Sequence, residues 1–150
     1  MVLGYIYSIT VRWKLAEFEF AKVNESGIQS SQALAALGYV QYAQHKVPES
    51  VAMLQKALAV DARNANALNS LGFIYAEEGI DCGRALTLCR QAVDINPRNP
   101  AYLDSLGWAN FRAGDFKEAR ACIRKALYLA PGNKEIAGHL RQVMEKLKNS

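Results

Sequence analysis

The sequence predicts an all-α fold, an α-solenoid of antiparallel helix pairs with a C-terminal capping helix. Small residues recur at a fixed interval of 34 or 35 positions, which is typical of helical hairpins that stack on one another. Three series share these steps, and because they agree they define a single repeat. The series are Gly4, Gly38, Gly72 and Gly107; Ala16, Ser50, Ala85 and Ala119; and Val23, Ala57, Ala92 and Ala126.

The spacing also predicts which residues touch within each helix pair. Two antiparallel helices approach closely only where small residues lie at the crossing point, and larger apolar residues fill the flanks. The glycines are expected at this point on the first helix of each pair. The residues expected opposite them on the second helix are Phe20, Leu54, Cys89 and Ile123.

The three series divide a single domain, residues 1–150, into five segments. In chain order they are a truncated repeat at 1–30, repeats at 31–64, 65–99 and 100–133, and a capping helix at 134–148, with one residue inserted between Gly79 and Ala85. The expected helices are 1–10, 13–25, 31–44, 48–61, 65–78, 83–95, 100–113, 116–129 and 134–148.

Proline, glycine and aspartate mark the ends of these helices. Pro97 and Pro131 are expected to end second helices, because proline cannot continue a helix. Gly79 and Gly114 are expected in turns, where a positive φ is often required. Asp115 is expected to cap the helix that follows it by accepting a backbone N–H bond.

The first repeat lacks its opening residues when it is counted back from the second. The apolar residues Val2, Ile6 and Ile9 are then expected on the side that would stack on a preceding repeat, and repeat proteins need a polar cap on such a side. This motivates an alternative function, the self-assembly of identical chains through the uncapped first repeat. The sequence leaves open whether the chain is a segment of a longer array.

The last helix, 134–148, is expected to close the array at the other end. Its apolar residues form one stripe, and Arg141 stands where the repeats have glycine, so no second helix needs to pack there. An amphipathic helix on a membrane surface is the alternative. The stripe consists of Ile136, Leu140, Val143, Met144 and Leu147.

Composition and charge argue against several classes of function. The formal net charge of +4 is dispersed, and the group Arg141, Lys146 and Lys148 is interpreted as a solvated face, so no nucleic-acid partner is expected. No apolar stretch approaches the ~20 residues that span a bilayer, and no secretory signal is found. Membrane insertion is therefore not expected, and a cytoplasmic location is favoured. The cysteines lack a C-x-x-C spacing and are expected to be idle thiols.

No catalytic, cofactor or metal site is predicted, and the chain is not expected to be an enzyme. A Ser or Cys nucleophile needs a base within hydrogen-bond reach, and the only histidines are His45 and His139. His45 is expected in a turn and His139 on the last helix, each in solvent or in packing. The sequence contains no glycine-rich phosphate loop and no His-Glu-x-x-His motif.

Residues 100–133 closely resemble the consensus of the tetratricopeptide repeat, and the resemblance extends over nearly the whole chain. Three positions depart from it: Gln41 replaces an aromatic residue, Ser50 an alanine and Ala62 a proline. The resemblance implies a right-handed superhelix whose first helices line a concave groove, and it favours a bacterial source. The matching residues are Leu106, Gly107, Phe111, Ala119, Ala126 and Pro131.

The resemblance assigns function to the groove side of each first helix. An aromatic residue follows each glycine, and rigid rings on a preformed concave surface favour the docking of a peptide or an amphipathic helix of a partner protein. The alternative is that these rings only pack neighbouring first helices. The expected partner-binding residues are Tyr5, Tyr39, Tyr42, Asn66, Asn69, Phe73, Asp104, Trp108, Phe111 and Arg112.

The resemblance also argues against one class of ligand. Family members that hold the C-terminal carboxylate of heat-shock chaperones use a lysine and asparagines in the first two repeats and basic residues in the third. This ligand is not expected here, because the corresponding positions are Ala35, Tyr39, Ser70, Ala101 and Ser105.

Overall fold

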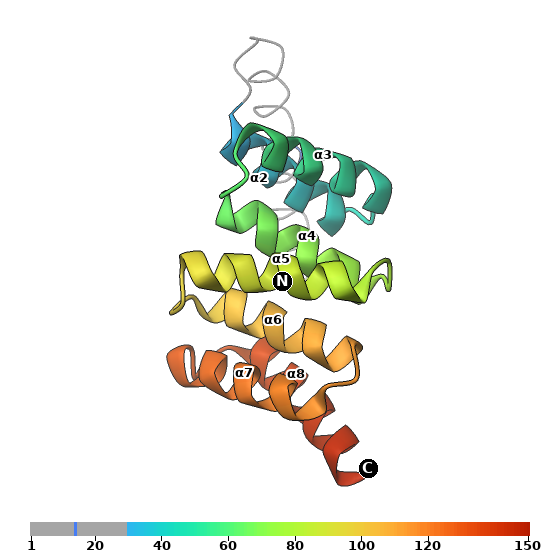
Figure 1. The fold of residues 1–150 in the computed structure, drawn as a ribbon, viewed down its shortest axis with the longest axis vertical. Helices are drawn as coiled ribbons and strands as arrows, with labels where there is room; N and C mark the ends of the chain where they lie inside the picture. The colour runs from blue at the N-terminus through green and yellow to red at the C-terminus, as the bar shows by residue number, and fades with distance from the viewer. Residues whose placement is uncertain (1–13, 15–29) are drawn as a thin grey trace, which may run out of the picture. The chain divides into compact units, whose positions relative to one another are not determined.

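A computed structural model gives the fold of the chain and describes Lys14 and residues 30–150. This part of the chain forms seven α-helices and no strand (Figure 1). Every helix end lies within one residue of the expected bound, and the expected helices 1–10 and 13–25 lie outside the described residues apart from Lys14. None of the seven helices has both the length and the hydropathy needed to cross a membrane. The helices are α2 (Ser31–Ala43), α3 (Val47–Val60), α4 (Ala65–Glu77), α5 (Cys82–Ile95), α6 (Pro100–Arg112), α7 (Phe116–Leu129) and α8 (Lys134–Lys148).

The chain divides into two compact units, residues 1–67 and 68–150, and each is described by itself. In the first unit α2 packs against α3. A Cβ placed on Gly38 would stand 2.7 Å from Cγ of Leu54, so glycine is what lets the two helices approach this closely. The Ser50 hydroxyl donates a hydrogen bond of 2.6 Å to the Gly38 carbonyl, which satisfies this buried polar group at a position where the repeat consensus has alanine. The predicted crossing of Gly38 with Leu54 is confirmed.

A chain of buried hydrogen bonds ties the start of α2 to the turn before α4. The Ser31 hydroxyl donates to the carbonyl of Ala57 and accepts from Nδ2 of Asn64, each at 2.8 Å. Oδ1 of Asn64 accepts from the backbone N–H of Ala67 at 3.1 Å and so caps α4. Because these polar groups are hydrogen-bonded, they can be buried without the penalty of an unsatisfied donor or acceptor.

In the second unit the same kind of helix crossing occurs twice. Gly72 of α4 meets Cys89 of α5, where a Cβ on the glycine would stand 2.6 Å from the sulfur. Gly107 of α6 meets Ile123 of α7 with still less room. Both pairs are the ones that the repeat spacing predicts, so the predicted pairing is confirmed here as well.

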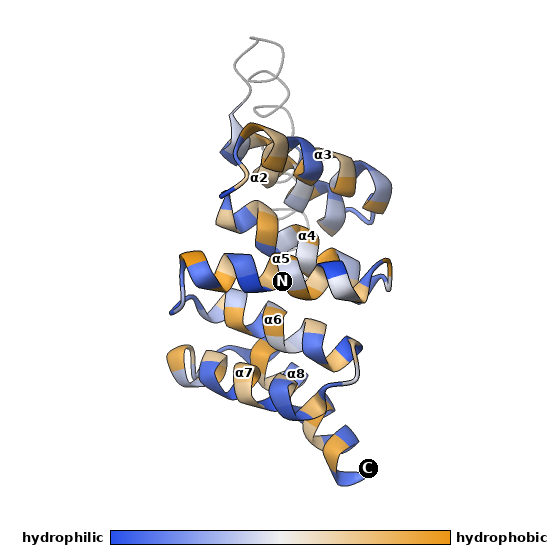
Figure 2. Cartoon of the chain, viewed as in Figure 1, coloured by the Kyte–Doolittle hydropathy of each residue, from blue (hydrophilic) through white to orange (hydrophobic). Residues whose placement is uncertain are grey.

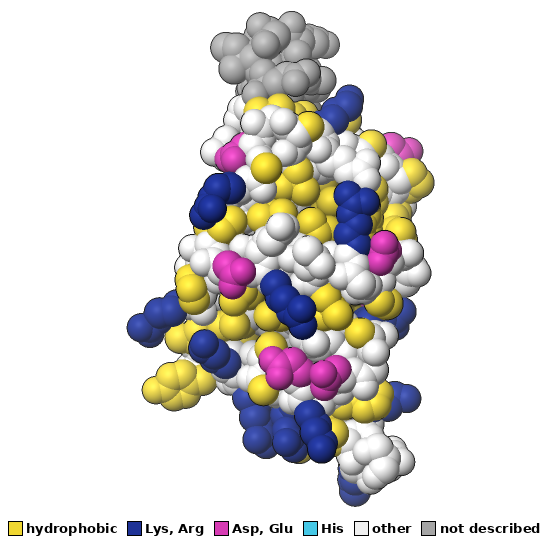
Figure 3. All heavy atoms as spheres, in the orientation of Figure 1, with side chains coloured by type: hydrophobic (Ala, Val, Ile, Leu, Met, Phe, Trp, Pro, Cys, Tyr) yellow, Lys and Arg dark blue, Asp and Glu magenta, His cyan; other side chains and the backbone are white. Residues whose placement is uncertain are grey.

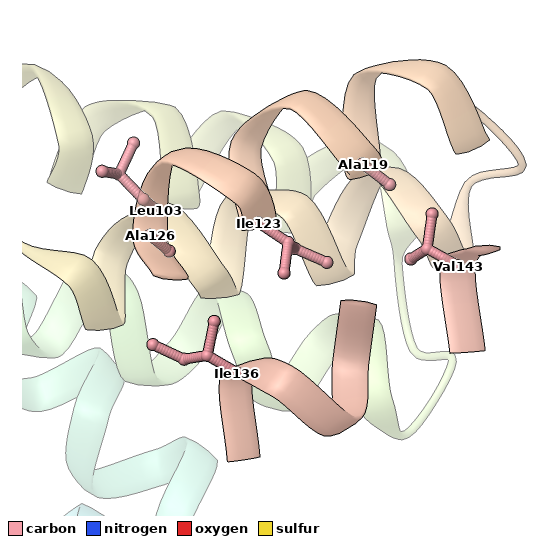
Figure 4. Packing of buried hydrophobic residues seen from close by; sticks show 6 residues of the cluster. All are labelled: Leu103, Ala119, Ile123, Ala126, Ile136 and Val143. Atoms are coloured by element: carbon pink, nitrogen blue, oxygen red, sulfur yellow. The ribbon is translucent and has the colours of Figure 1, made fainter. Parts of the chain in front are cut away.

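The core of the second unit lies where α6, α7 and α8 meet (Figure 4). Ile136 and Val143 belong to the apolar stripe expected on the last helix, and both are buried. Burying such a side chain contributes about 1.5–3 kcal/mol relative to leaving it exposed. Figure 2 shows the corresponding alternation of hydrophobic and hydrophilic residues along α7 and α8. The core cluster consists of Leu103, Ala119, Ile123, Ala126, Ile136 and Val143.

Residues with positive φ form the turns inside the helix pairs. Gly79 and Gly114 have φ values of 64° and 90°, as predicted. His45, at the equivalent place between α2 and α3, has a φ of 62°. This conformation is unfavourable for a residue that carries a Cβ, and the sequence analysis did not predict it.

Proline and aspartate lie at the helix ends as predicted. α5 ends two residues before Pro97, and α7 ends two residues before Pro131. The carboxylate of Asp115 accepts a hydrogen bond of 3.1 Å from the N–H of Glu118 and caps α7. The local chemistry of these residues therefore sets the bounds of α5 and α7, the second helices of their pairs.

Candidate functional site

The predicted partner-binding residues fall on both units, and the set on the first unit is small. Tyr39 and Tyr42 lie three residues apart on α2, which places them on the same side of this helix. Tyr39 is 61% exposed, whereas Tyr42 is half-buried. Asn66 is exposed in the first turn of α4. Tyr5 lies outside the described residues.

In the second unit, Trp108 of α6 is the centre of the predicted set. Its side chain is buried, and its indole N–H donates a hydrogen bond of 2.6 Å to Oε2 of Glu77 on α4. The ring stacks on Phe111, with 4.8 Å between ring centroids, and on His139 of α8 at 4.4 Å. Much of the indole surface is thus covered by neighbouring side chains of the same unit, which is the packing role that the sequence left open as an alternative.

Asp104 and His139 join α6 to α8. Nδ1 of the imidazole lies 2.9 Å from both carboxylate oxygens of Asp104, and the two side chains are only 12% and 10% exposed. Burial by itself would lower the pKa of His139. The hydrogen bond to Asp104 and the charges of Asp104, Glu135 and Glu77 outweigh this effect and raise the pKa above its ordinary value of 6.5. The protonated imidazole is therefore favoured at this place.

Arg112 joins the end of α6 to the end of α4. Its Nε donates to the carbonyl of Ala76 at 3.1 Å, and its Nη2 donates to the carbonyl of Glu77 at 3.3 Å. These carbonyls belong to the last turn of α4, where the helix dipole presents partial negative charge, so the guanidinium stabilises this helix end. The guanidinium has five N–H donors, and only two of its nitrogens are used in this way.

Phe73 and Asn69 of α4 lie beside this cluster. Phe73 precedes Glu77 by four residues and therefore lies on the same side of α4 as the acceptor of the Trp108 indole. Both Phe73 and Asn69 are half-buried, and Oδ1 of Asn69 is buried without a hydrogen-bond partner. We call the surface formed by the following residues the aromatic face: Phe73 and Glu77 of α4, Trp108 and Arg112 of α6, and His139 of α8.

Two members of the aromatic face were not among the predicted partner-binding residues. The sequence does not single out Glu77, and it predicts His139 only in solvent or in packing. A helical projection from Phe73 would have found Glu77, because a spacing of four residues keeps the same side of the helix. The place of His139 depends on how α8 docks on α6, and nothing in the local sequence encodes that contact.

The described residues offer little for nucleophilic or metal chemistry. They contain no cluster of three potential metal ligands, and none of their hydroxyl or thiol groups is hydrogen-bonded to His139. Burial raises the pKa of Cys89 to about 12. Burial and the neighbouring Glu118 raise the pKa of Cys122 to about 11. Both thiols therefore stay protonated near neutral pH, which makes them poor nucleophiles.

Comparison with known proteins identifies the repeat. Two family models described as tetratricopeptide repeat match this chain, one over residues 35–100 and the other over residues 100–133. A TPR repeat-containing protein of Pseudomonas aeruginosa is 40% identical over 87 residues, which is 58% of this chain and 15% of the relative. The cellulose synthase operon protein C of Xanthomonas axonopodis is 33% identical over 119 residues, 75% of this chain and 8% of that protein. The chain thus spans only a small part of the curated relatives it matches, and both are bacterial, in agreement with the source that the sequence favours.

Solved structures show the same fold. A structure of Pseudomonas aeruginosa pilF has a TM-score of 0.77 and 23% identity, over 98% of this chain and 67% of that one. The first TPR domain of Spaghetti, solved with an HSP90 peptide bound, has a TM-score of 0.70 and 23% identity, over 80% of this chain and 94% of that one. With the matched repeats and the helix pairs described above, these similarities show that the chain belongs to the tetratricopeptide repeat family and has its all-α, helical-repeat solenoid fold.

Proposed function

We propose that this chain is a non-catalytic scaffold that binds a peptide or a helix of a partner protein on the first helices of its repeats. The observation that carries the proposal is the construction of the aromatic face. Its central ring, Trp108, is fixed from three sides, by Glu77, Phe111 and His139. A ligand that docks here meets a platform that is already ordered, and little entropy is lost on binding.

The chemistry of the aromatic face suits an extended or helical segment of protein. Phe73 and the neighbouring rings offer apolar area, which favours an apolar ligand side chain. Arg112 retains N–H donors for ligand carbonyls. Such a donor next to an apolar anchor would fix the register of a peptide backbone.

The first unit adds a ring of different character. Tyr39 is mostly exposed, so its phenol is free to contact a ligand along with the half-buried Tyr42 on the same side of α2. An exposed aromatic side chain that combines apolar area with a hydroxyl is typical of protein-binding surfaces. We expect Tyr39 to contribute to partner binding within its own unit.

A peptide complex of a protein with the same fold supports the general mode of binding. The Spaghetti domain holds an HSP90 peptide. This chain lacks the family's lysine and asparagines for a chaperone carboxylate, and has Ala35, Tyr39 and Ser70 at three of the positions concerned. We therefore propose a different peptide sequence as the ligand, docked through rings and an arginine rather than through a carboxylate clamp.

The test uses peptides that are selected for binding to this chain. A peptide library displayed on phage is selected against the folded chain, and the affinities of the selected peptides are measured by calorimetry for Phe73→Ala, for Arg112→Ala and for a control, Lys125→Ala, on the exposed side of α7. We expect each variant of the aromatic face to weaken binding by about tenfold, and the control to bind as the wild type does. Unchanged affinity in both variants of the aromatic face would overturn the proposal.

Self-assembly through the first repeat stays a prediction, because Val2, Ile6 and Ile9 lie outside the described residues. The absence of a nucleic-acid partner and the cytoplasmic location also stay proposals. Sedimentation of the chain over a concentration series tests self-assembly directly, since a species that stays monomeric at the highest concentration would remove it.

A further inference from the structure

A groove runs along the outer side of α8, away from the residues that define the aromatic face. Its volume is about 780 Å³, within the range of pockets that bind small ligands and inserted side chains. Leu127 of α7 and Leu140, Met144 and Leu147 of α8 form its apolar lining. The three residues of α8 follow the spacing i, i+4 and i+7, so the lining is a straight strip of about two helical turns.

The apolar lining of the groove is open to solvent. Leu127, Leu140 and Leu147 are half-buried, and Met144 is 38% exposed. Val143, one position before Met144, lies about 100° around the helix from it and is fully buried in the core of the unit. The single apolar stripe of α8 is thus covered along the edge that holds Ile136 and Val143, and among the described residues it is open along the edge that holds Met144. Met144 adds an adaptable contact, because its unbranched side chain fits apolar surfaces of varied shape.

Positive charge lies on one rim of the groove. Arg141 and Lys148 are about two helical turns apart on the same side of α8, with Glu145 as the single acid among the lining residues. Together α7 and α8 carry eight lysines and arginines and three glutamates, whereas the whole chain has 18 basic and 14 acidic residues. The excess of five on these two helices exceeds the net charge of +4 of the whole chain. Figure 3 shows Lys and Arg side chains gathered over this part of the second unit.

These rim charges have no partner within the described part of the chain. The ion pair between His139 and Asp104 is the salt bridge found in the second unit, and neither Arg141 nor Lys148 takes part in one. An acidic ligand would therefore gain new ion pairs at the rim without breaking existing ones. A basic rim beside an apolar strip is complementary to a ligand with an apolar stripe and acidic residues beside it.

We propose that the groove between α7 and α8 binds an amphipathic α-helix of a partner protein that has acidic residues beside its apolar stripe. Apolar side chains at i, i+3 or i+4, and i+7 of this helix lie on Leu140, Met144 and Leu147, parallel to the strip. Glutamates or aspartates beside the stripe pair with Arg141 and Lys148. This site is independent of the aromatic face, and a single chain can hold a ligand at each.

Other occupants fit the groove less well. A second copy of the chain that docked through the same surface would bring Arg141 and Lys148 against their own equivalents, which is unfavourable. A membrane surface is contacted by projecting apolar side chains, whereas Leu140 and Leu147 are half-buried in a hollow. A nucleic acid would pair with the rim but would leave the apolar strip uncovered.

The test uses a synthetic helical peptide of about 16 residues, with leucines at i, i+3, i+4 and i+7 and glutamates on both sides of this stripe. A second peptide has lysine in place of every glutamate. Fluorescence anisotropy of the labelled peptides measures their affinity for the full chain. We expect the acidic peptide to bind at least about tenfold more tightly than the basic one. Equal binding of the two peptides, or preference for the basic one, would overturn the proposal.

Matched variants locate the site. The double variant Arg141→Glu and Lys148→Glu should reverse the preference between the two peptides, and Met144→Glu should weaken the acidic peptide. Lys146→Glu makes the same change of charge as either single substitution, Arg141→Glu or Lys148→Glu, on the same helix but outside the groove lining, and should keep the wild-type preference. If Lys146→Glu acts as strongly as either of these single variants, general electrostatic attraction explains the binding and the groove does not.

Further measurements address the competing occupants and the fold. Circular dichroism melts show whether each variant keeps the wild-type fold, and a Met144→Leu variant preserves the apolar strip if Met144→Glu is unstable. Concentration-dependent dimerisation that Met144→Glu abolishes would assign the groove to a second copy. Binding to phosphatidylserine vesicles or to duplex DNA that is lost in Met144→Glu, without binding of the acidic peptide, would also overturn the proposal. If the phage-selected peptides do not bind to the aromatic face, the proposed function fails, but this test of the groove is unaffected.

Discussion

The sulfur of Cys89 lies 2.6 Å from the point where a Cβ on Gly72 would stand. The carbonyl oxygen of Ala85 and the backbone nitrogen of Cys89 lie 3.1 and 3.2 Å from the same point. Backbone atoms of α5 therefore fill the space that a side chain on α4 would need, and they cannot move without moving the helix. This contact sets how closely α4 and α5 pack.

Replacing Gly72 with leucine should separate α4 from α5 and lower the free energy of unfolding by about 1–3 kcal/mol or more. Gly83→Ala is the matched control, because a Cβ on exposed Gly83 would meet nothing closer than Oδ1 of Asp81 at 3.6 Å. The control should be neutral or slightly stabilising, since alanine favours the helix over glycine. Thermal denaturation measures both variants. A Gly72→Leu protein that melts at the wild-type temperature would contradict the helix crossing.

Trp108→Ala should destabilise the second unit by about 3–5 kcal/mol, the usual range when a large buried side chain is truncated. The sequence predicts that Trp108 is a groove residue, but the burial of its side chain and its contacts with Glu77 and His139 give it a structural role as well. Trp108→Phe keeps an aromatic ring and loses the hydrogen bond to Glu77, so a smaller loss of about 1–2 kcal/mol is expected. Urea denaturation measures the free energy of unfolding of the wild type and of both variants. Equal values for all three proteins would contradict the structural role of Trp108.

The Asp104–His139 pair should make stability depend on pH. The folded state raises the pKa of His139, so the folded protein holds this proton more tightly than the unfolded chain does. The stabilisation is fully present below the ordinary histidine pKa of 6.5, and it is lost as the pH rises through the raised pKa of the folded state. Denaturant midpoints between pH 5 and pH 9 should fall for the wild type and fall less for His139→Gln and Asp104→Asn.

His45→Gln serves as the control for the second histidine of the chain. It should keep the wild-type dependence on pH, because His45 lies in the exposed turn between α2 and α3. A His139→Gln protein with the same pH dependence as the wild type would show that the pair with Asp104 is not coupled to folding.

His45→Gly should stabilise the first unit by about 0.5–1 kcal/mol, because glycine adopts a φ of 62° at a lower cost in free energy than histidine does. The equivalent turns of the second unit already have Gly79 and Gly114. His45→Ala removes the imidazole but keeps the Cβ and should show no such gain. The midpoint of urea denaturation compares the variants, and an alanine variant as stable as the glycine variant would refute the assignment of strain to the backbone.

Much of the fold could be predicted because the same repeat occurs several times in the sequence. A single glycine such as Gly72 predicts little, but three series in the same phase predict both the helices and their partners. The crossings of Gly38 with Leu54, Gly72 with Cys89 and Gly107 with Ile123 are all confirmed. The repeat boundaries and the truncated first repeat stay predictions.

The residues that cap the helices recur with the period of the repeat, and the three series of small residues do not include them. Ser30, Asn64, Asn99 and Asn133 each accept a hydrogen bond from the backbone N–H three residues later, and each caps the first helix of a segment. Their spacing is again 34 or 35 residues. These positions hold Ser or Asn rather than one residue type, so they do not stand out unless their side chains are compared by hydrogen-bonding chemistry.

The candidate site was less predictable than the fold. The period places Tyr39, Phe73 and Trp108 at equivalent positions, yet Tyr39 is 61% exposed and Trp108 only 5%. Trp108 is covered by Glu77 of the preceding repeat and by His139 of the capping helix, and neither residue is repeated along the chain. The period of the repeat fixes the position of a residue on its helix. The exposure of its side chain depends also on neighbouring residues that are not repeated.

The most direct test of the binding role follows the indole N–H of Trp108 by NMR while a phage-selected peptide is added. Trp13→Phe assigns the signal, because the chain has two tryptophans. A ligand on the aromatic face changes the surroundings of the Trp108 indole, so the Trp108 signal should shift and saturate with the affinity found by calorimetry. An unmoved Trp108 signal at saturation, with the shifts confined to amides of α7, would contradict the proposed function.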